Sequence, residues 1–171
     1  DVAEVAVKWE LAEAQTLRKL NMKNVPSPIG RDYDWPGLYK PMSHQIDTAS
    51  FLTLHKRAFC FNEQGTGKTA SAIWASDYLL KQKIIRRVLV VCPLSIMQSA
   101  WQADLFKFAL HRTVNVAYGD RNKRKDIINS LSDYVIINFD GLEIVKDEIK
   151  NGGFDLIIID EANAYKNAKT K

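Results

Sequence analysis

Short, continuously apolar segments recur along the chain and alternate with segments of helical pattern. The clearest are Val-Leu-Val-Val-Cys at 88–92 and Leu-Ile-Ile-Ile at 156–159. A strand that is apolar at every position, rather than at every second one, is typical of a parallel sheet buried on both faces. Parallel strands need long crossover connections, which are usually helices. The chain is therefore expected to form an α/β fold, an open and mostly parallel sheet flanked by helices.

The same patterns place the individual elements of this sheet. Strands are expected at 57–61, 88–92, 114–118, 134–138 and 156–159. Helices are expected between them, at 43–55, 68–81, 95–108, 120–131 and 142–150. Such strand–helix units connect through right-handed crossovers, so each helix should lie against one face of the sheet. Region 43–171 is accordingly predicted to be one α/β lobe.

Region 1–42 has a different character and is predicted to be an N-terminal extension of the lobe. Apolar residues at helical spacing indicate an amphipathic helix over 2–22, with Ala12 and Leu20 on its packed face. Four of the five prolines then fall within 23–42, which predicts a loop or linker there. The extension is thus expected to be a helix followed by a Pro-rich linker.

Composition excludes several classes of protein. Hydrophobic residues make up 46% of the 171 residues, which is ordinary for a globular chain and too apolar for a disordered one. The longest apolar run, 88–94, is far shorter than the roughly 20 residues that a membrane helix needs, so no membrane partner is expected. The net charge of +4 is compatible with a polyanionic partner but does not identify one.

Cysteine usage and the first residues bear on the cellular compartment. Cys60 and Cys92 lie in apolar segments, no Cys-x-x-Cys pair occurs and the three histidines are scattered, so a zinc site is not expected. Buried free thiols are typical of a reducing compartment. No basic region followed by an apolar stretch opens the chain, so no secretory signal is expected. We expect a protein of the cytoplasm, nucleoid or nucleus, and not a secreted one.

The segment 59–69, Phe-Cys-Phe-Asn-Glu-Gln-Gly-Thr-Gly-Lys-Thr, carries the strongest local signal. Its glycines let the backbone curl so that successive N–H groups point at one phosphate, and the helix that follows adds the donors of its first turn. The predicted nucleotide-binding residues are Gln64, Gly65, Thr66, Gly67, Lys68 and Thr69. Lys68 would place its charge between the β- and γ-phosphates, and Thr69 would offer its hydroxyl to Mg²⁺. The strict motif has glycine where Asn62 stands, so an ordinary strand–turn–helix corner is the alternative.

An acidic pair, Asp160 and Glu161, directly follows the apolar segment 156–159. Ligands of open α/β sheets bind at the carboxyl ends of the strands, where this pair would lie. Asp160 would bind Mg²⁺ through a water molecule and so complement Thr69. Glu161 would orient and deprotonate the attacking water. The alternative is a strand that ends in a solvated Asp-Glu turn.

Two basic runs lie outside these motifs. Lys81–Arg87 precedes a strand, at the edge away from the predicted ligand site, and is expected to be a solvated face. Asp120–Asp126 follows a strand and so lies at the functional edge, where it would meet either DNA phosphates or solvent.

The phosphate loop and the acidic pair, in this order, resemble the first RecA-like lobe of superfamily-two helicases and translocases. Finer features resemble the Swi/Snf-type DNA-dependent ATPases. The residues that carry this resemblance are Asn-Glu-Gln-Gly-Thr-Gly-Lys-Thr at 62–69, the strand with Cys-Pro-Leu-Ser and Trp101 over 88–101, Val-Ala-Tyr-Gly-Asp-Arg-Asn-Lys-Arg at 116–124, Tyr-Val-Ile-Ile-Asn-Phe-Asp-Gly-Leu at 134–142, and the acidic motif with a later Lys-Asn pair over 154–171. The resemblance covers roughly residues 39–171.

The resemblance implies ATP and Mg²⁺ as ligands and Lys68 and Glu161 as catalytic residues. It implies that Gln45 reads the adenine, while a plain polar helix residue is the alternative. Ser95 and Asn138 match positions that touch the nucleic-acid backbone, and for Ser95 a simple helix N-cap is the equal alternative. Such phosphate contacts carry no sequence information, which suits a motor on duplex DNA of any sequence.

The function that the resemblance implies is the ATP-binding lobe of a DNA-dependent ATPase that translocates on duplex DNA. A second RecA-like lobe of the same parent chain would supply the arginine that completes the site. The alternatives are a strand-separating helicase or restriction-type motor subunit and, in a different class, a non-catalytic nucleotide- or DNA-binding module. Asn163 departs from the family's His or Asp. Since Lys171 lies ten residues past Glu161, we expect the fragment alone to hydrolyse ATP very poorly.

Overall fold

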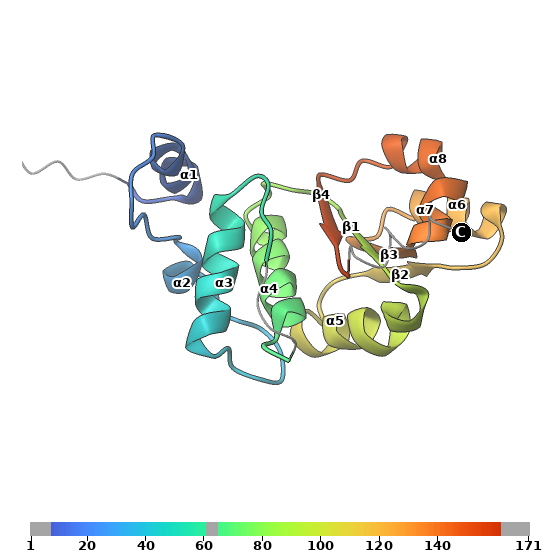
Figure 1. The fold of residues 1–171 in the computed structure, drawn as a ribbon, viewed down its shortest axis with the longest axis horizontal. Helices are drawn as coiled ribbons and strands as arrows, with labels where there is room; N and C mark the ends of the chain where they lie inside the picture. Colours follow the sequence, from blue (N-terminus) through green and yellow to red (C-terminus); the bar gives the residue numbers. More distant parts are fainter. Residues whose placement is uncertain (1–7, 61–64, 162–171) are drawn as a thin grey trace, which may run out of the picture.

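The computed structural model describes residues 8–60 and 65–161 of the chain. Within these residues the centre is a four-stranded parallel sheet in the order β2–β3–β1–β4 (Figure 1). The strands are β1 (Val88–Cys92), β2 (Val114–Ala117), β3 (Tyr134–Asn138) and β4 (Leu156–Ile159). The open parallel α/β sheet predicted from the apolar segments is confirmed, and these four strands lie where they were expected.

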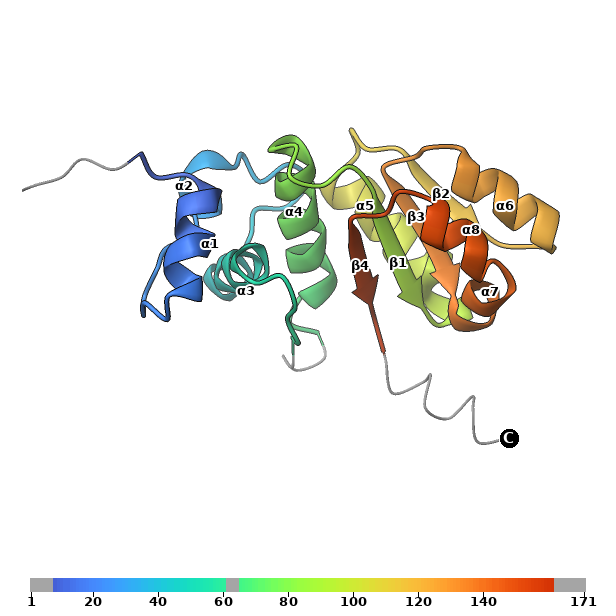
Figure 2. The same ribbon diagram turned by 90° about the horizontal axis from the view of Figure 1, so that it is seen from above.

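Helices flank the sheet on both faces (Figures 1 and 2). Those that follow the phosphate loop are α4 (Lys68–Lys81), α5 (Ala103–Phe108), α6 (Arg121–Asn129), α7 (Phe139–Ile144) and α8 (Lys146–Asn151). A 3-10 turn, η1 (Leu94–Ile96), and a π-helical turn, η2 (Met97–Gln102), precede α5. The helix expected over 142–150 is instead two helices, because the buried Val145 leaves the helical conformation between α7 and α8.

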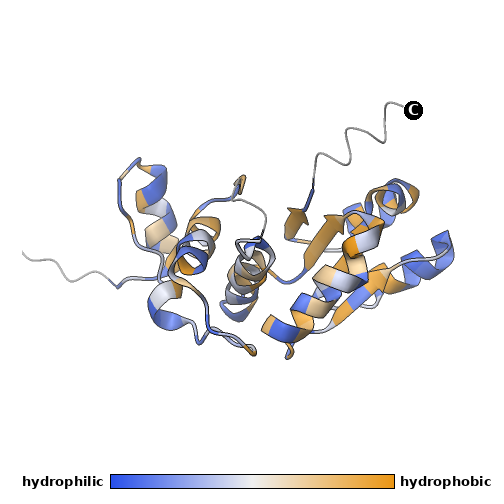
Figure 3. Cartoon of the chain, turned by 60° about the horizontal axis from the view of Figure 1, so that its bottom comes forward, coloured by the Kyte–Doolittle hydropathy of each residue, from blue (hydrophilic) through white to orange (hydrophobic). Residues whose placement is uncertain are grey.

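The two central strands are buried on both faces, as continuous apolar segments predict. Every residue of β1 and β3 is buried. Alternate residues of β1 point to opposite sides: Val88 and Val90 join a core with α4 and α5, whereas Leu89 and Val91 join a core with Ile128 of α6. Figure 3 shows the strands as almost entirely apolar and the helices around them as mixed polar and apolar.

Strand β4 departs from the expectation of complete burial. Its residues alternate between partly buried and exposed, and Ile157 and Ile159 are 55% and 58% exposed. Leu156 and Ile158 pack against the core beneath α4 and α5. The other face of β4 is open among the described residues because β4 stands at the edge of the sheet, beyond the helices that cover the core of Leu89 and Val91.

The strand expected at 57–61 is not present in the described part of that range. Residues 57–60 belong to no strand of the sheet, and Phe59 is 80% exposed, while residue 61 lies outside the described residues. An apolar segment becomes a strand only when a neighbour offers it a ladder of hydrogen bonds. Sequence pattern reports the apolar residues but not whether such a neighbour is adjacent.

The N-terminal extension is shorter in helix than expected and closely packed. It holds α1 (Leu11–Lys19) and α2 (Ile29–Asp32), and α3 (Ser43–Leu54) follows. Lys8, Trp9 and Glu10 are not helical, and residues 1–7 lie outside the described residues. The buried residues of α1 are Leu11 and Ala14, so the prediction that placed Ala12 and Leu20 inward is wrong. The packed face predicted for a 21-residue helix is therefore not the face that the nine-residue helix α1 turns toward the core.

A buried core joins this extension to the lobe. Ile29 and Tyr33 from the extension pack with Ala49 of α3 and with Trp74 and Tyr78 of α4. The Trp74 indole N–H donates to the carbonyl oxygen of Pro36 at 2.9 Å. The division of the chain at residue 42 stays a prediction.

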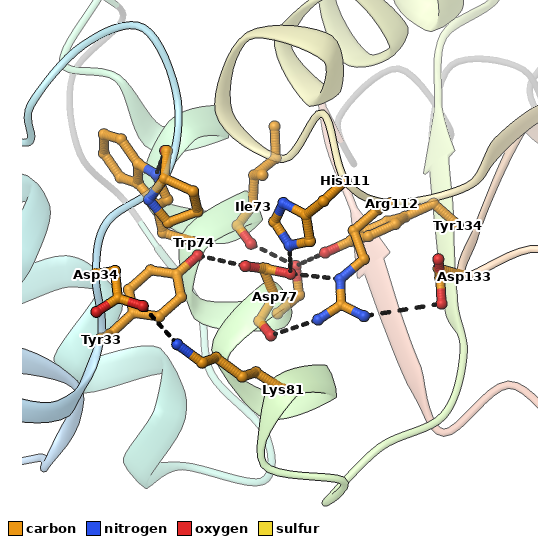
Figure 4. Close-up of polar contacts among 12 residues, drawn as sticks. Tyr33, Asp34, Ile73, Trp74, Asp77, Lys81, His111, Arg112, Asp133 and Tyr134 are labelled. Carbon is orange, nitrogen blue, oxygen red and sulfur yellow. Dashed lines mark hydrogen bonds and ion pairs between the residues drawn. The ribbon is translucent and has the colours of Figure 1, made fainter.

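Next to this core, the carboxylate of Asp77 in α4 forms polar contacts with the N-terminal extension and with the loop between α5 and β2 (Figure 4). The Tyr33 hydroxyl donates to its Oδ2 at 2.6 Å, Arg112 donates to its Oδ1 and His111 Nε2 lies 2.9 Å from the same atom. Asp77 is 1% exposed. Burial, followed by the charge of Asp77, raises the pKa of Tyr33 above its ordinary value. We call these four residues the Asp77 junction; it ties the extension, α4 and the α5–β2 loop together.

Every helix in the described part of the chain is too short or too polar to cross a lipid bilayer.

Candidate functional site

The phosphate loop leads into the N-terminus of α4. Gly65 has φ 81° and Gly67 has φ 74°, in the left-handed region where glycine is unstrained, and Gly67 is the N-cap of the helix. Lys68 and Thr69 are the first two helical residues. The first turn of a helix presents backbone N–H groups together with the positive end of the helix dipole, a combination that suits an anion. Gln64, also predicted to bind nucleotide, lies outside the described residues.

The first turn of α3 packs directly on this loop. His44 Nε2 lies 3.1 Å from the carbonyl oxygen of Thr66. The Gln45 side chain covers Gly67 so closely that a Cβ on that glycine would lie 2.0 Å from Gln45 Nε2. Gln45 Oε1 accepts a hydrogen bond from the backbone N–H of Met42 at 2.9 Å, which holds the amide in place. The structure therefore brings Gln45 against Gly67 of the phosphate loop, although the two residues are 22 positions apart in the sequence.

The second part of the site is a row of residues at the carboxyl edge of the sheet. Cys92 pairs with Asn138 across β1 and β3, and Val91 pairs with Ile159 across β1 and β4. The backbone N–H of Asp160 donates to the carbonyl oxygen of Val91 at 2.9 Å, so the carboxylate follows directly on the ladder. Burial, together with the charges of Asp160 and Glu161, raises the pKa of Cys92 to about 12. Cys92 thus stands between the predicted metal-binding and DNA-binding residues.

Both carboxylate oxygens of Asp160 accept hydrogen bonds. The indole N–H of Trp101 donates to Oδ2 at 2.9 Å, and the backbone N–H of Glu161 donates to Oδ1 at 2.9 Å. A carboxylate oxygen has two lone pairs, so each oxygen retains acceptor capacity. Glu161 itself is exposed and has φ 50°, a conformation that costs a non-glycine residue about 1 kcal/mol or more.

The hydroxyl of Thr69 and the carboxylate of Asp160 form a set of oxygen donors that fits Mg²⁺. No cluster of three or more His, Cys, Asp or Glu side chains that could form a protein-only metal cage occurs among residues 8–60 and 65–161. Mg²⁺ instead prefers one or two protein oxygens and completes its shell with water and phosphate oxygens. A hydroxyl at Thr69 and a carboxylate at Asp160 are ligands of that kind. Figure 2 shows the start of α4 and the tip of β4 on the same side of the molecule.

The two predicted DNA-binding residues differ in exposure. Ser95 is exposed in η1, where Pro93 holds the N-cap position, so the structure does not make Ser95 an N-cap. Asn138 is 7% exposed, and its Oδ1 accepts a hydrogen bond from Arg124 Nη1 at 3.1 Å. The role of both residues toward DNA stays a prediction.

Sequence reasoning missed three residues that support this site. His44 contacts the phosphate loop, Trp101 holds Asp160, and Arg124 joins Asn138 to the end of β2 by donating to the carbonyl oxygens of Ala117 and Gly119. The basic run 120–126 signalled a charged surface, yet Arg124 within it is only 5% exposed. A charge run does not reveal which of its members turns inward.

The basic run 81–87 contains a similar exception. Arg87 is 6% exposed and donates to the carbonyl oxygens of Ile128, Ser132 and Gly152, and its burial lowers the pKa of its guanidinium. The expectation of a solvated face is therefore wrong for Arg87. Arg86 does lie at the surface, where it pairs with Asp155.

Known proteins resemble this chain in sequence and in fold. The TATA-binding protein-associated factor mot1 of Schizosaccharomyces pombe is 26% identical over 168 residues, which are 90% of this chain and 8% of that protein. The ISWI chromatin-remodeling complex ATPase ISW2 of Saccharomyces cerevisiae is 29% identical over 147 residues, which are 82% of this chain and 12% of that protein. The structure of the Sulfolobus solfataricus SWI2/SNF2 ATPase core in complex with dsDNA matches 80% of this chain and 29% of that chain, with 26% identity and a TM-score of 0.66.

The chain thus spans less than a third of each of these relatives. A family model described as the SNF2-related domain matches residues 6–171, nearly the whole length. Its phosphate loop, its carboxyl-edge acidic pair and its sheet all fall within that match, and the chain belongs to the SNF2-related domain family.

Proposed function

We propose that the chain is the ATP-binding lobe of a DNA-dependent ATPase that couples ATP hydrolysis to movement along duplex DNA. The observation that carries this proposal is the phosphate loop of Gly65 and Gly67 at the N-terminus of α4. The start of α4 lies on the same side of the molecule as the end of β4 (Figure 2), and Asp160 and Glu161 directly follow β4 in the sequence. Membership of the SNF2-related family supports it.

The first step is to hold the triphosphate. The N–H groups of the loop and of the first turn of α4 would bind the phosphate oxygens, and the Lys68 ammonium would balance their charge. Gln45, which already lies against Gly67, carries an amide that can pair with an adenine edge. Gln45 Oε1 already accepts a hydrogen bond from the backbone N–H of Met42. To pair with adenine, the amide must therefore share or give up that hydrogen bond.

The second step is hydrolysis. Thr69 and Asp160 would hold Mg²⁺, which when bound neutralises charge on the β- and γ-phosphates. Glu161 is exposed beside this position, where its carboxylate can orient a water and take its proton. The second lobe of the longer protein would supply the arginine that stabilises transition-state charge.

DNA binding is proposed for the same edge of the sheet. Ser95 is exposed in η1, which follows β1, and Asn138 is the last residue of β3, so both lie near the carboxyl ends of strands. Hydroxyl and amide groups bind phosphates of any sequence. The solved SNF2 core with the same fold is described in complex with dsDNA, which supports duplex DNA as the partner.

Calorimetric titration with ATP and Mg²⁺ tests the proposal. The wild-type chain should bind ATP. Lys68→Ala should bind it more weakly, by about tenfold or more, because the ammonium that balances the charge of the phosphates is lost. Lys81→Ala is the matched control: it removes a lysine from the other end of α4, where the ammonium pairs with exposed Asp34. If wild-type and Lys68→Ala bind ATP equally, the phosphate-loop assignment is wrong. If neither binds ATP, the result favours the alternative of a non-catalytic module.

Turnover is tested in the full-length protein. Glu161→Gln should keep ATP binding and lose DNA-stimulated hydrolysis, because an amide cannot accept the proton of water. Measuring phosphate release with duplex and with single-stranded DNA also separates a duplex translocase from a strand-separating helicase. Retained turnover in Glu161→Gln would remove this residue from the role of base.

A further inference from the structure

Trp101 is a buried core residue whose indole N–H is also hydrogen-bonded to a residue of the candidate site. Its ring is 1% exposed and packs in the core between α4, η2, α5 and the sheet. Its indole N–H nevertheless reaches the carboxyl edge and donates to Asp160 Oδ2 at 2.9 Å, across 59 residues of sequence. Burial alone would be served by an aromatic ring without a donor.

The backbone around Trp101 is unusual in the same place. Residues Met97–Gln102 form a π-helical turn between the 3-10 turn η1 and α5. Such turns are rare, and they often occur at functional sites because one extra residue per turn redirects the side chains that follow. Met97 and Trp101, four residues apart, are the buried residues of this turn. The π-helical turn therefore accompanies the placement of the indole at the sheet edge.

The partner of the indole is the residue whose orientation the site depends on. The carboxylate of Asp160 follows the last residue of β4 and is only partly buried, so its torsions are not fixed by packing alone. The Glu161 N–H bonds Oδ1 and the Trp101 N–H bonds Oδ2, so the two donors together fix the plane of the carboxylate. The remaining lone pairs then have a defined direction.

We propose that Trp101 is a positioning residue for Asp160: its indole N–H fixes the carboxylate so that the free lone pairs face the Mg²⁺ of a bound nucleotide. This inference rests on the proposed ATP-binding function. Partners that orient metal ligands commonly change metal affinity by 10–100-fold when they are removed. The prediction is an effect on Mg²⁺ that is separate from an effect on nucleotide.

Trp101→Phe tests this directly, because it keeps an aromatic ring in the core and removes only the donor and part of the volume. ATP binding is measured by calorimetry across a series of Mg²⁺ concentrations and in EDTA. The Mg²⁺ concentration for half-maximal enhancement of ATP binding should rise about tenfold, whereas the affinity for ATP in EDTA should match the wild type.

Trp74→Phe is the matched control. Trp74 is also 1% exposed, and its indole N–H is also hydrogen-bonded at 2.9 Å, but to the carbonyl oxygen of Pro36 in the extension. It should lose comparable stability and leave the Mg²⁺ dependence unchanged. Equal Mg²⁺ dependence in Trp101→Phe and the wild type, or an equal shift in both variants, would overturn the positioning role.

A second measurement needs no variant that could fail to fold. In the wild-type chain the indole N–H resonances of Trp101 and Trp74 are followed by ¹⁵N–¹H NMR as Mg²⁺ is added to the chain with ATP. The Trp101 resonance should shift and the Trp74 resonance should not. A stationary Trp101 resonance while Mg²⁺ strengthens ATP binding contradicts the positioning role alone. Absence of any ATP binding contradicts the proposed function instead.

Discussion

At the scale of single residues, the site depends on backbone conformations that few residue types accept. Gly65 and Gly67 both have φ near 80°, yet their surroundings differ. Among the described residues, no atom lies within 4 Å of a Cβ built on Gly65, whereas a Cβ on Gly67 would meet Gln45 Nε2 at 2.0 Å. The first glycine is required by conformation, and the second by conformation and by a close neighbour.

This difference predicts the cost of two alanine substitutions. Gly65→Ala should lower the free energy of unfolding by about 1–2 kcal/mol, the cost of a left-handed alanine. Gly67→Ala should cost more, because Gln45 must also leave the Met42 N–H. Urea denaturation measures both. Adding Gln45→Ala to Gly67→Ala should return the loss to the level of Gly65→Ala, and a double variant as unstable as Gly67→Ala would show that Gln45 is not the obstacle.

Cys92 makes the stability of the chain sensitive to alkaline pH. Its pKa rises from 9.0 to about 12 on folding because burial disfavours the thiolate and Asp160 and Glu161 lie near it. A raised folded pKa contributes stability below pH 9 that is lost progressively as the pH rises from 9 toward 12. The free energy of unfolding should therefore fall less steeply between pH 8 and 10 in Cys92→Ala than in the wild type. Cys60→Ala, at a partly exposed site, is the control and should follow the wild type.

At the scale of elements, sequence patterns predicted the sheet well and its edges poorly. The apolar segments at 88–92 and 134–138 became the central strands because they are apolar at every position and have neighbours on both sides. The segment at 57–60 also contains apolar residues but is not a strand, since strand pairing depends on what lies beside a segment in the fold. The same limit applies to β4. Its apolar sequence predicts burial on both faces, but one face is open because β4 lies at the edge of the sheet.

The candidate site shows the same division. Local signals were sufficient to place Lys68 and Thr69 at the start of α4 and Asp160 at the end of β4. Contacts between distant segments were not visible: no pattern of residues predicts that the Trp101 indole reaches Asp160 or that Arg124 turns inward to Asn138. Periodicity reports which face of an element is apolar, but not which polar atom it will meet across the fold.

The Asp77 junction is a prediction at this scale, because it joins three segments through one carboxylate. Asp77→Asn would leave Arg112 without its buried counter-charge, and we expect a loss of about 3 kcal/mol in the free energy of unfolding. Asp34→Asn removes an exposed partner of Lys81 and should cost no more than about 1 kcal/mol. Urea denaturation at neutral pH compares the two. Equal losses would mean that the junction contributes no more than a surface ion pair.

At the scale of the whole molecule, α4 belongs to two cores at once. Ile73 and Leu80 pack toward the sheet, whereas Trp74, Ala75 and Tyr78 pack toward the N-terminal extension. Nine of its fourteen residues are buried. By contrast, α8 has no buried residue and α1 has two. The stability of the described fold is therefore concentrated around α4 and the central strands.

Hydrogen exchange should reveal this distribution. The amides of α4, β1 and β3 should exchange most slowly, at rates that approach those of global unfolding, and the amides of α1 and α8 should exchange much faster. Mass spectrometry of deuterated peptides measures the order. Fast exchange throughout α4, at the rate of α8, would contradict the view that α4 unites the two cores.

The position of α4 between two cores has a mechanical consequence. The helix begins at the phosphate loop and carries Asp77 nine residues later, about 14 Å along its axis. A helix such as α4, packed in a core on each side, is expected to move as a rigid body when one of its ends is displaced. A shift of the loop on gaining or losing a phosphate would therefore arrive at the extension as a movement of Tyr33, which makes the N-terminal segment the natural place to attach a probe of the nucleotide state.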